Sequence, residues 1–591
     1  MIARNIRSGT RANVLLIAIF FLTGLIIYRL FNLTLAQHSE FVKSAKSQYS
    51  NPSALLAGRG NIYFSDIASN GTKIVATNRS SFFAYSNNSA ISFAKELAEK
   101  IAPILNQNKD VLEALLSQKD KTYLVLARNL TKKQAEAING LKVKGLAATS
   151  EITRYYDEVF SAAHVLGFVG FDGNQRVGRS GVEFSYDKIL GGETKTLEIL
   201  GNKTYSDIFK FLKFWRKDDA KKENAEAEGN EAKQDLNIVG SDIVLTIDQN
   251  IQSVVALALN SVLKKWSAPR GSIIVEDPNT GAILAMASSP SFDPNNYSEY
   301  QLNDFLNPNT QEVFEPGSSF KPVTMAAALD SGVITPNTTY DDTGAVKIGG
   351  YTIRNFNEKA NGIQTMRQVL EHSLNTGAIF AQEKTGDDQF LNYVVSFGFG
   401  QKTGIDLNAE ISGNISNLYS GRKINFLTAS FGQGIAVTPL QLANAYSAIA
   451  NGGKLMRPYL VKEIMRPDGT TVKTEPKILG APITEKTSVQ LKSMLVDVVD
   501  KGFDKARIKG YDVAGKTGTA QIPDPSGGGY LDNDQFVHDF VGFAPAYSPR
   551  FVILIKMERP KGIKFAADSL SPVFGDIARY LIRYFNIPPT R

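Results

Sequence analysis

The 591-residue chain contains no cysteine, two tryptophans and four histidines. Without cysteine the protein can form no disulfide, no thiolate nucleophile and no zinc–sulfur site. The histidines, at positions 38, 164, 372 and 538, are scattered and lack the spacing of metal ligands. We therefore expect neither a metal site nor a cofactor.

The chain also lacks a strong excess of charge of one sign. Lysine and arginine total 65 against 58 acidic residues, a net charge of +7 that is spread along the sequence. No basic run is interleaved with aromatic residues, so a nucleic-acid partner is not expected. Apolar residues make up 43% and charged residues 21%, which is ordinary for a globular protein. The length exceeds that of one hydrophobic core and predicts two or three domains.

A long apolar run lies near the N-terminus. Three arginines precede an uncharged run over 12–28, and apolar character resumes beyond Arg29. A spanning helix needs about 20 residues, and Arg29 can extend its charge to the membrane interface. The alternatives are a buried core helix, which the basic flank disfavours, and a cleaved signal peptide, for which the run is long and no small-residue cleavage site follows. We predict a cytoplasmic tail over 1–11 and an uncleaved anchor over 12–35, with the rest of the chain outside the membrane.

Two folded regions are expected after the anchor. Residues 36–215 alternate helical pieces such as FAKELAEKIAPIL with strands such as TYLVLA, and contain no catalytic constellation. Residues 216–236 form a charged segment that cannot bury a core, and we predict a linker or insert there. Residues 237–591 begin with the hairpin signal SIIVEDPNTGAILAMAS and end with DFVGFAPAYSPRFVILIKME and a helix. Overall this predicts a multidomain α+β (α/β) fold, whose second domain has an antiparallel sheet between helical layers.

The stretch VFEPGSSFKPVTMAAAL, residues 313–329, places a serine and a lysine at the mouth of an apolar helix. Ser318 and Lys321 are three residues apart and project from one face. Pro322 agrees with a helix start, where its missing N–H needs no partner. Either the serine caps the helix, or Ser318 is a nucleophile and Lys321 its proton acceptor.

Neither S-x-x-K nor K-T-G is specific by itself. S-x-x-K recurs at Ser185/Lys188, Ser261/Lys264 and Ser420/Lys423, and K-T-G occurs at 384–386, 402–404 and 516–518. Context favours Lys516, which lies in the extended small-residue segment YDVAGKTGTAQI. Ser373-Leu374-Asn375 stands between the two motifs. S-x-x-K, S-x-N and K-T-G in this order are the set of penicillin-binding proteins and class A β-lactamases.

Together with these motifs, nearly the whole chain resembles a class B penicillin-binding protein. Four stretches are similar to that family, namely RGNIYFSD, GRSGVEFSYDKILGG, SFGFGQKTGIDL and FGQGIAVTPLQLANAYSAIANGG. Two further stretches resemble its division-type branch more than its elongation-type branch, namely VFEPGSSFKP and VAGKTGTAQ. RGNIYFSDIASNG lacks the usual Asp-Arg-Asn-Gly ending, and RYYD replaces a common Arg-x-Tyr-Pro. Both departures lie in the non-catalytic half. The resemblance implies an elongated N-terminal domain and a C-terminal penicillin-binding transpeptidase domain.

The resemblance further implies acyl transfer from a peptidoglycan stem peptide ending in D-Ala-D-Ala, with β-lactams as inhibitors that acylate Ser318. Lys321 must be neutral to accept a proton, which burial and a neighbouring cation such as Lys516 favour. By resemblance, Ser373 relays protons to the leaving amine, and Asn375 bonds the substrate and Lys321. Substrate binding then falls to Thr517, Gly518 and Thr519, and the oxyanion hole to the backbone N–H groups of Ser318 and Thr519.

Several alternatives stay open. An elongation-type transpeptidase or a D,D-carboxypeptidase shares the chemistry. A serine β-lactamase needs an E-x-x-L-N loop, and the two matches, at 299–303 and 371–375, lie out of order or overlap the S-x-N motif. A membrane scaffold or β-lactam sensor is the non-enzyme alternative. The domain plan implies a bacterial cytoplasmic-membrane protein with its catalytic domain outside, working with a separate glycosyltransferase and division-complex proteins.

Overall fold

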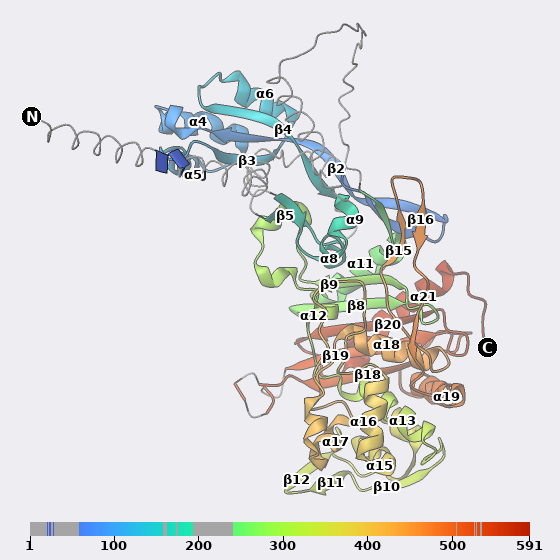
Figure 1. Cartoon of the computed structure of the whole chain (residues 1–591). Helices are drawn as coiled ribbons and strands as arrows, with labels where there is room; N and C mark the ends of the chain where they lie inside the picture. Colours follow the sequence, from blue (N-terminus) through green and yellow to red (C-terminus); the bar gives the residue numbers. More distant parts are fainter. Residues whose placement is uncertain are drawn as a thin grey trace, which may run out of the picture.

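A computed structural model describes residues 20–21, 23–24, 28, 58–157, 162–172, 175–192, 240–503, 505–524, 526–527, 529–531 and 535–591. The predicted tail over 1–11 and linker over 216–236 lie outside these ranges, as does the predicted anchor over 12–35 apart from five positions. Within the described ranges, no helix has the length and apolar character needed to span a bilayer. Figure 1 shows an elongated molecule, with the N-terminal part at one end and the helices around residues 320–430 at the other.

A seven-stranded mixed sheet forms the centre of the N-terminal part. Its order is β16-β15-β7-β1-β2-β3, with β4 also paired to β2, and β1 runs parallel to β7. The strands β7, β15 and β16 come from beyond the predicted linker, so both halves of the sequence build this sheet. The strands are β1 Ile62–Asp66, β2 Gly71–Ser86, β3 Leu124–Leu130, β4 Leu146–Tyr156, β7 Asp242–Asp248, β15 Val461–Met465 and β16 Thr471–Lys473.

Three helices cover the outer part of this sheet: α4 (Ala94–Leu105), α5 (Lys109–Leu116) and α6 (Lys132–Gly140). In α4 the apolar residues Leu97, Ile101 and Leu105 recur at helical spacing and are buried against β2, β3 and β4. Thr131 starts α6 by accepting a hydrogen bond from the Gln134 N–H while the Gln134 side chain accepts from the Thr131 N–H. The predicted helical pieces and the strand in TYLVLA are therefore formed.

A buried charge network ties the short helix α8 (Gly181–Ser185) to the sheet. The Glu183 carboxylate is inaccessible to solvent and accepts hydrogen bonds from Arg59 Nε at 2.8 Å and Arg154 Nε at 2.7 Å. Arg59 precedes β1, and Arg154 lies in β4. Tyr156 adds a hydroxyl 3.3 Å from the same carboxylate. One acidic side chain thus joins three segments that are far apart in sequence.

The predicted antiparallel sheet of the second domain joins both ends of that domain. Its order is β18-β19-β20-β8-β9, and every neighbouring pair is antiparallel. The strands are β8 Arg270–Glu276, β9 Ile283–Ser289, β18 Ala514–Gln521, β19 Phe536–Ala544 and β20 Phe551–Glu558. The hairpin signal at Pro278–Gly281 in the sequence connects β8 and β9, and a turn at 545–550 connects β19 and β20.

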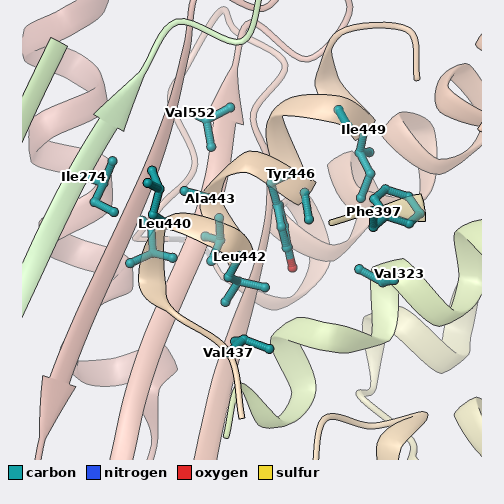
Figure 2. Packing of buried hydrophobic residues seen from close by; sticks show 14 of the residues in the cluster. Ile274, Val323, Phe397, Val437, Leu440, Leu442, Ala443, Tyr446, Ile449 and Val552 are labelled. Atoms are coloured by element: carbon teal, nitrogen blue, oxygen red, sulfur yellow. The ribbon is translucent and has the colours of Figure 1, made fainter. Parts of the chain in front are cut away.

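Helices cover both faces of this sheet. The first and last helices of the domain, α11 (Gln249–Lys265) and α21 (Ser571–Tyr584), pack on one face. The wholly buried α18 (Pro439–Ala450) packs on the other. Figure 2 shows Tyr446 of α18 between the strands that carry Ile274 and Val552 and the helix that carries Val323. The Tyr446 hydroxyl donates a 2.7 Å hydrogen bond to the Ser319 carbonyl oxygen, which ties this core to the turn before α13.

The remaining elements extend the helical layer away from the sheet. The helices are α12 Pro308–Gln311, α13 Lys321–Asp330, α14 Met366–Glu371, α15 Asn375–Thr385, α16 Asp387–Ser396, α17 Lys423–Ala429 and α19 Glu485–Gly502. Two small ribbons lie beside them, formed by β10 (Thr339–Asp342) with β13 (Gly362–Thr365) and by β11 (Ala345–Ile348) with β12 (Tyr351–Arg354). As predicted, the middle of the domain is largely helical.

Removing the Glu183 carboxylate is expected to destabilise the N-terminal part. In Glu183→Ala, the buried Arg154 guanidinium loses its carboxylate and Arg59 keeps only that of Asp187. Removing one partner of a buried ion pair typically costs about 3–5 kcal/mol. Thermal melting and urea unfolding of the purified full-length chain measure the loss. The control is Glu136→Ala, which removes an exposed ion pair with Lys132 and is expected to change stability little. Equal melting temperatures for the two variants would contradict the assigned role of the buried network.

Candidate functional site

Ser318 lies in a tight turn that leads directly into a buried helix. The 3-10 turn η5 (Gly317–Phe320) is followed without interruption by α13, whose first residue is Lys321. Pro316 occupies the capping position of the turn and makes no side-chain cap. Ser318 Oγ instead lies 3.1 Å from Lys321 Nζ. The capping interpretation of Ser318 is therefore wrong, and the expected serine–lysine contact is present.

Two glycines hold this turn against its neighbours. Gly317 has a φ of +56°, and its N–H donates to the Gly432 carbonyl oxygen at 3.0 Å. A Cβ at Gly317 would lie 3.2 Å from both the Thr519 carbonyl oxygen and the Ala520 Cβ. The backbone that carries Ser318 therefore runs close beside strand β18.

Ser373 brings two lysine side chains together. Its Oγ lies 3.2 Å from Lys321 Nζ and 3.0 Å from Lys516 Nζ, and its carbonyl oxygen accepts from Lys321 Nζ at 2.5 Å. Ser373 has a φ of +55°, in the left-handed region that few non-glycine residues adopt. The next residue, Leu374, donates its N–H to the Val369 carbonyl oxygen and thereby holds the chain in this conformation. A single hydroxyl thus bridges the two amines.

The two lysines are both inaccessible to solvent but differ in charge. Burial, followed by the positive charge of Lys516, lowers the pKa of Lys321 well below its ordinary value. Burial lowers the pKa of Lys516 to about 8, while the charge of Asp539 acts in the opposite direction. The lowered pKa of Lys321 favours the uncharged amine that can accept a proton, whereas Lys516, with a pKa of about 8, is mostly an ammonium at neutral pH.

Asn375 does not make the contact expected of it. It is the first residue of α15 and does not cap the end of a helix. Its side-chain amide donates to the Arg354 carbonyl oxygen of β12 at 2.9 Å, and its backbone N–H donates to Asn355 Oδ1 at 2.9 Å. Each hydrogen bond of Lys321 Nζ in the described structure goes to Ser318 or Ser373. The ribbon strand β12 therefore holds the Asn375 amide away from Lys321 while leaving the residue at the groove.

The K-T-G motif at 516–518 forms the strand β18 beside the serine turn. Thr517 and Thr519 line the groove, and the Thr519 hydroxyl accepts from the Ala566 N–H at 3.2 Å. The other two K-T-G matches lie elsewhere. Lys384 is in the last turn of α15 over the Phe380 ring, and Lys402 is an exposed residue beyond α16.

An open groove of about 1630 Å³ runs over the site. Ser318, Ser373, Asn375, Thr517 and Thr519 all contribute to its surface. Its volume exceeds the roughly 300–1,000 Å³ of a small-molecule pocket, so the groove suits an extended ligand. Its further lining combines aromatic side chains with cations, namely Phe356, Phe431, Phe503 and Phe565 with Arg354, Arg559, Lys561 and Lys564.

Three contributors to the site have no recognisable sequence signal. Asn355 orients the start of α15, Tyr446 anchors the serine turn, and Asp539 lies buried behind β18. Glu276 lies not in the β8–β9 turn but at the end of β8, where it is fully buried. Alternation within β19 places Asp539 on an inward face, but only the partner strands determine what it meets there.

The chain is similar to known proteins over both of its folded regions. Residues 271–579 match the penicillin-binding protein transpeptidase domain, and residues 54–204 match the penicillin-binding protein dimerisation domain. Stage V sporulation protein D of Bacillus subtilis (strain 168) is 33% identical over 532 residues, which cover 88% of this chain and 78% of that protein. Peptidoglycan D,D-transpeptidase FtsI of Escherichia coli (strain K12) is 31% identical over 494 residues, which cover 83% and 77%. The apo crystal structure of penicillin-binding protein 3 from Mycobacterium tuberculosis is similar with a TM-score of 0.62 and 29% identity, over 74% of this chain and 92% of that one.

Any side chain at Gly518 is expected to disrupt the site. A Cβ there would lie 2.1 Å from Asp539 Oδ2 and 2.4 Å from the Pro316 carbonyl oxygen, so Gly518→Ala forces strand and turn apart. Such overpacking typically costs about 1–3 kcal/mol, which thermal melting detects. Gly480→Ala is the control, because its Cβ would have no atom within 4 Å. A Gly518→Ala protein as stable as the control would show that the turn and strand separate freely.

Proposed function

The chain belongs to the class B penicillin-binding proteins and is a peptidoglycan D,D-transpeptidase, and we propose that it forms its acyl-enzyme on Ser318 during septal wall synthesis. The observation that carries the assignment of the nucleophile is the 3.1 Å separation between Ser318 Oγ and the buried Lys321 amine. A serine hydroxyl is a weak nucleophile until a base within hydrogen-bond reach accepts its proton.

In the acylation step, Lys321 Nζ takes the Ser318 hydroxyl proton as Oγ attacks the carbonyl carbon of the penultimate D-alanine. The tetrahedral oxyanion is held by the backbone N–H groups of Ser318 and Thr519. This assignment is supported by the close approach of Gly317 to Thr519. When the carbon–nitrogen bond breaks, the Ser373 hydroxyl donates a proton to the leaving D-alanine amine and recovers one from the Lys321 ammonium.

Deacylation reverses these roles with a different amine. An amine from a neighbouring stem peptide loses its proton through Ser373 and attacks the Ser318 ester, forming the new amide and returning the proton to Ser318. Before acylation, the Lys516 ammonium, with Thr517 and Thr519, holds the terminal carboxylate of the donor, and Gly518 allows close approach of the strand. The size of the groove supports an amine acceptor on a second peptide over water, which a D,D-carboxypeptidase uses.

β-Lactams enter by the same route. Ser318 opens the lactam amide, but the amine stays tethered to the acyl group and the acceptor cannot replace it. The β-lactamase alternative is disfavoured because Glu371, the only match to its glutamate near the groove among the described residues, forms a 2.7 Å ion pair with Lys501.

The cellular setting rests on the sequence. The apolar run over 12–35 with its basic flank supports an anchor in the bacterial cytoplasmic membrane, with the catalytic domain on the outer side. Neither matched domain is a glycosyltransferase, so a separate polymerase supplies the glycan strands. Resemblance to the division-type branch agrees with the relative named FtsI and points to division-complex proteins as further partners, with an elongation role as the second candidate.

Replacing Ser318 is expected to abolish covalent labelling. The full-length chain treated with a fluorescent penicillin should carry one adduct that peptide mapping places on Ser318, and Ser318→Ala should carry none. Ser261→Ala is the control, because Ser261 belongs to another S-x-x-K match on the exposed side of α11 and should label normally. Labelling of folded Ser318→Ala would refute the nucleophile. Slow release of the adduct favours the transpeptidase, whereas rapid hydrolysis would favour a β-lactamase.

The rate of acylation is expected to fall on the alkaline side. Lys516 loses its charge as the pH rises through its pKa of about 8, so carboxylate binding weakens above that pH. The lowered pKa of Lys321 favours its neutral form, so activating Ser318 does not require the pH to rise. Stopped-flow measurement of the second-order acylation rate constant, corrected for lactam hydrolysis without protein, should show a decline of about tenfold per pH unit well above pH 8. A rate that climbs steadily to pH 10 would mean that Lys321 is charged at neutral pH.

A further inference from the structure

Asp539 is a fully buried carboxyl group that the reaction described above does not use. It lies in β19, and its neighbours across the sheet are Gly518 of β18 and Lys556 of β20. It is inaccessible to solvent, and in the described structure neither carboxylate oxygen accepts a hydrogen bond of ordinary geometry, because the nearby Ser319 hydroxyl donates to the Pro316 carbonyl oxygen instead. A buried acid without hydrogen-bond partners is costly, so the charges that surround it decide its protonation state.

The carboxylate of Asp539 lies directly behind the K-T-G glycine. Asp539 Oδ2 and the Pro316 carbonyl oxygen both approach the position that a Gly518 Cβ would occupy, at 2.1 and 2.4 Å. Pro316 precedes the turn that carries Ser318. Asp539 therefore lies at the junction of the substrate-binding strand and the nucleophile turn, on the side away from the groove.

Two cations share the face of the sheet on which Asp539 lies. Lys556 already has its own carboxylate, because its Nζ lies 2.6 Å from Glu558 Oε1. Lys516 pairs with Val541 and is the diagonal neighbour of Asp539 in the β18–β19 ladder. In the described structure, Lys516 Nζ bonds only to the Ser373 hydroxyl and the Thr517 carbonyl oxygen and has no ion pair. Lys516 is thus the cation that lacks a counter-charge.

We propose that Asp539 is a positioning residue of the acylation centre, whose carboxylate behind Gly518 keeps Lys516 charged and directed at Ser373. This inference rests on the proposed role of Ser318, Lys321 and Lys516. The effect passes along a line of buried groups, from Asp539 to Lys516 and from Lys516 to Lys321. Asp539 touches neither the substrate nor the reacting atoms and acts only through Lys516.

The titratable groups around Asp539 define the pH range of this effect. They are Lys516 of β18, Lys556 of β20 and Tyr446 of α18, with the hydroxyl of Ser319 in η5 and Lys321 beyond Lys516. Burial raises the pKa of Asp539 to about 7, partly offset by Ser319 and the two lysines. The carboxyl is therefore mostly neutral at pH 6 and charged at pH 8, and its influence on Lys516 grows over that interval.

The test compares acylation of the full-length chain and its Asp539→Asn variant by a fluorescent penicillin between pH 6 and pH 9.5. Losing a nearby negative charge lowers the pKa of a lysine, here by about one unit. The second-order rate constant of Asp539→Asn should equal that of the parent at pH 6. It should be about fivefold lower at pH 8 and about tenfold lower at pH 9, because Lys516 of the variant loses its charge at a lower pH.

Glu276→Gln is the matched control. Glu276 lies in the same sheet, is also inaccessible to solvent and also has no hydrogen-bond partner for either oxygen among the described residues, but it is in β8, two strands beyond β19. Its profile should follow that of the parent. Asp539→Ser serves as a second uncharged variant, and melting temperatures establish which proteins are folded.

The possible outcomes separate this inference from the proposed function. If the parent protein forms no adduct on Ser318, the proposed function fails. If the parent is acylated but Asp539→Asn slows the reaction equally at all pH values, or not at all, Asp539 has only a structural role and the inference is wrong. If both Asp539 variants fail to fold while Glu276→Gln folds, the inference is likewise overturned. The inference is supported if the decline of the acylation rate constant at high pH begins at a lower pH in an Asp539 variant but not in Glu276→Gln.

Discussion

The site depends on burying two lysine side chains around one serine hydroxyl. Two ammonium groups that share the Ser373 hydroxyl and lack water cannot both keep their charge at neutral pH. The surroundings of each amine determine which of the two lysines loses its charge. Lys321 and Lys516 both have hydroxyl and carbonyl hydrogen-bond partners, but Lys516 is also the diagonal neighbour of the buried carboxyl of Asp539 on the adjacent strand. The neutral amine is therefore the one beside Ser318, where a base is needed.

The fold keeps these groups buried from solvent. The turn that carries Ser318 accepts a hydrogen bond from the Tyr446 hydroxyl of α18 and donates one to the Gly432 carbonyl oxygen. Strand β18 approaches because Gly317 and Gly518 leave no side chain in the way. The left-handed Ser373 links two helices and turns its hydroxyl to the lysines. The groove stays open above them, so a long ligand reaches the nucleophile while the amines remain buried.

Much of this was predictable from the sequence. The hairpin of β8 and β9, the strands near the C-terminus and the helical middle follow from hydrophobic periodicity and turn residues. Ser318, Ser373 and Lys516 were recognisable because three motifs occur in one order. The sequence could not predict that β7, β15 and β16 join the N-terminal sheet, because strand pairing over such separations leaves no local signal. The contact of Asn375 with Arg354, and the environments of Asp539 and Glu276, likewise depend on which strands become neighbours.

The protonation states of the two lysines test the central claim most directly. Neutron diffraction from crystals of the protein in D₂O at neutral pH would place the deuterium atoms on both Nζ atoms. The account predicts two deuterons on Lys321 Nζ, with its lone pair directed at Ser318, and three on Lys516 Nζ. Three deuterons on Lys321, or two on Lys516, would contradict the assignment of Lys321 as the base that activates Ser318.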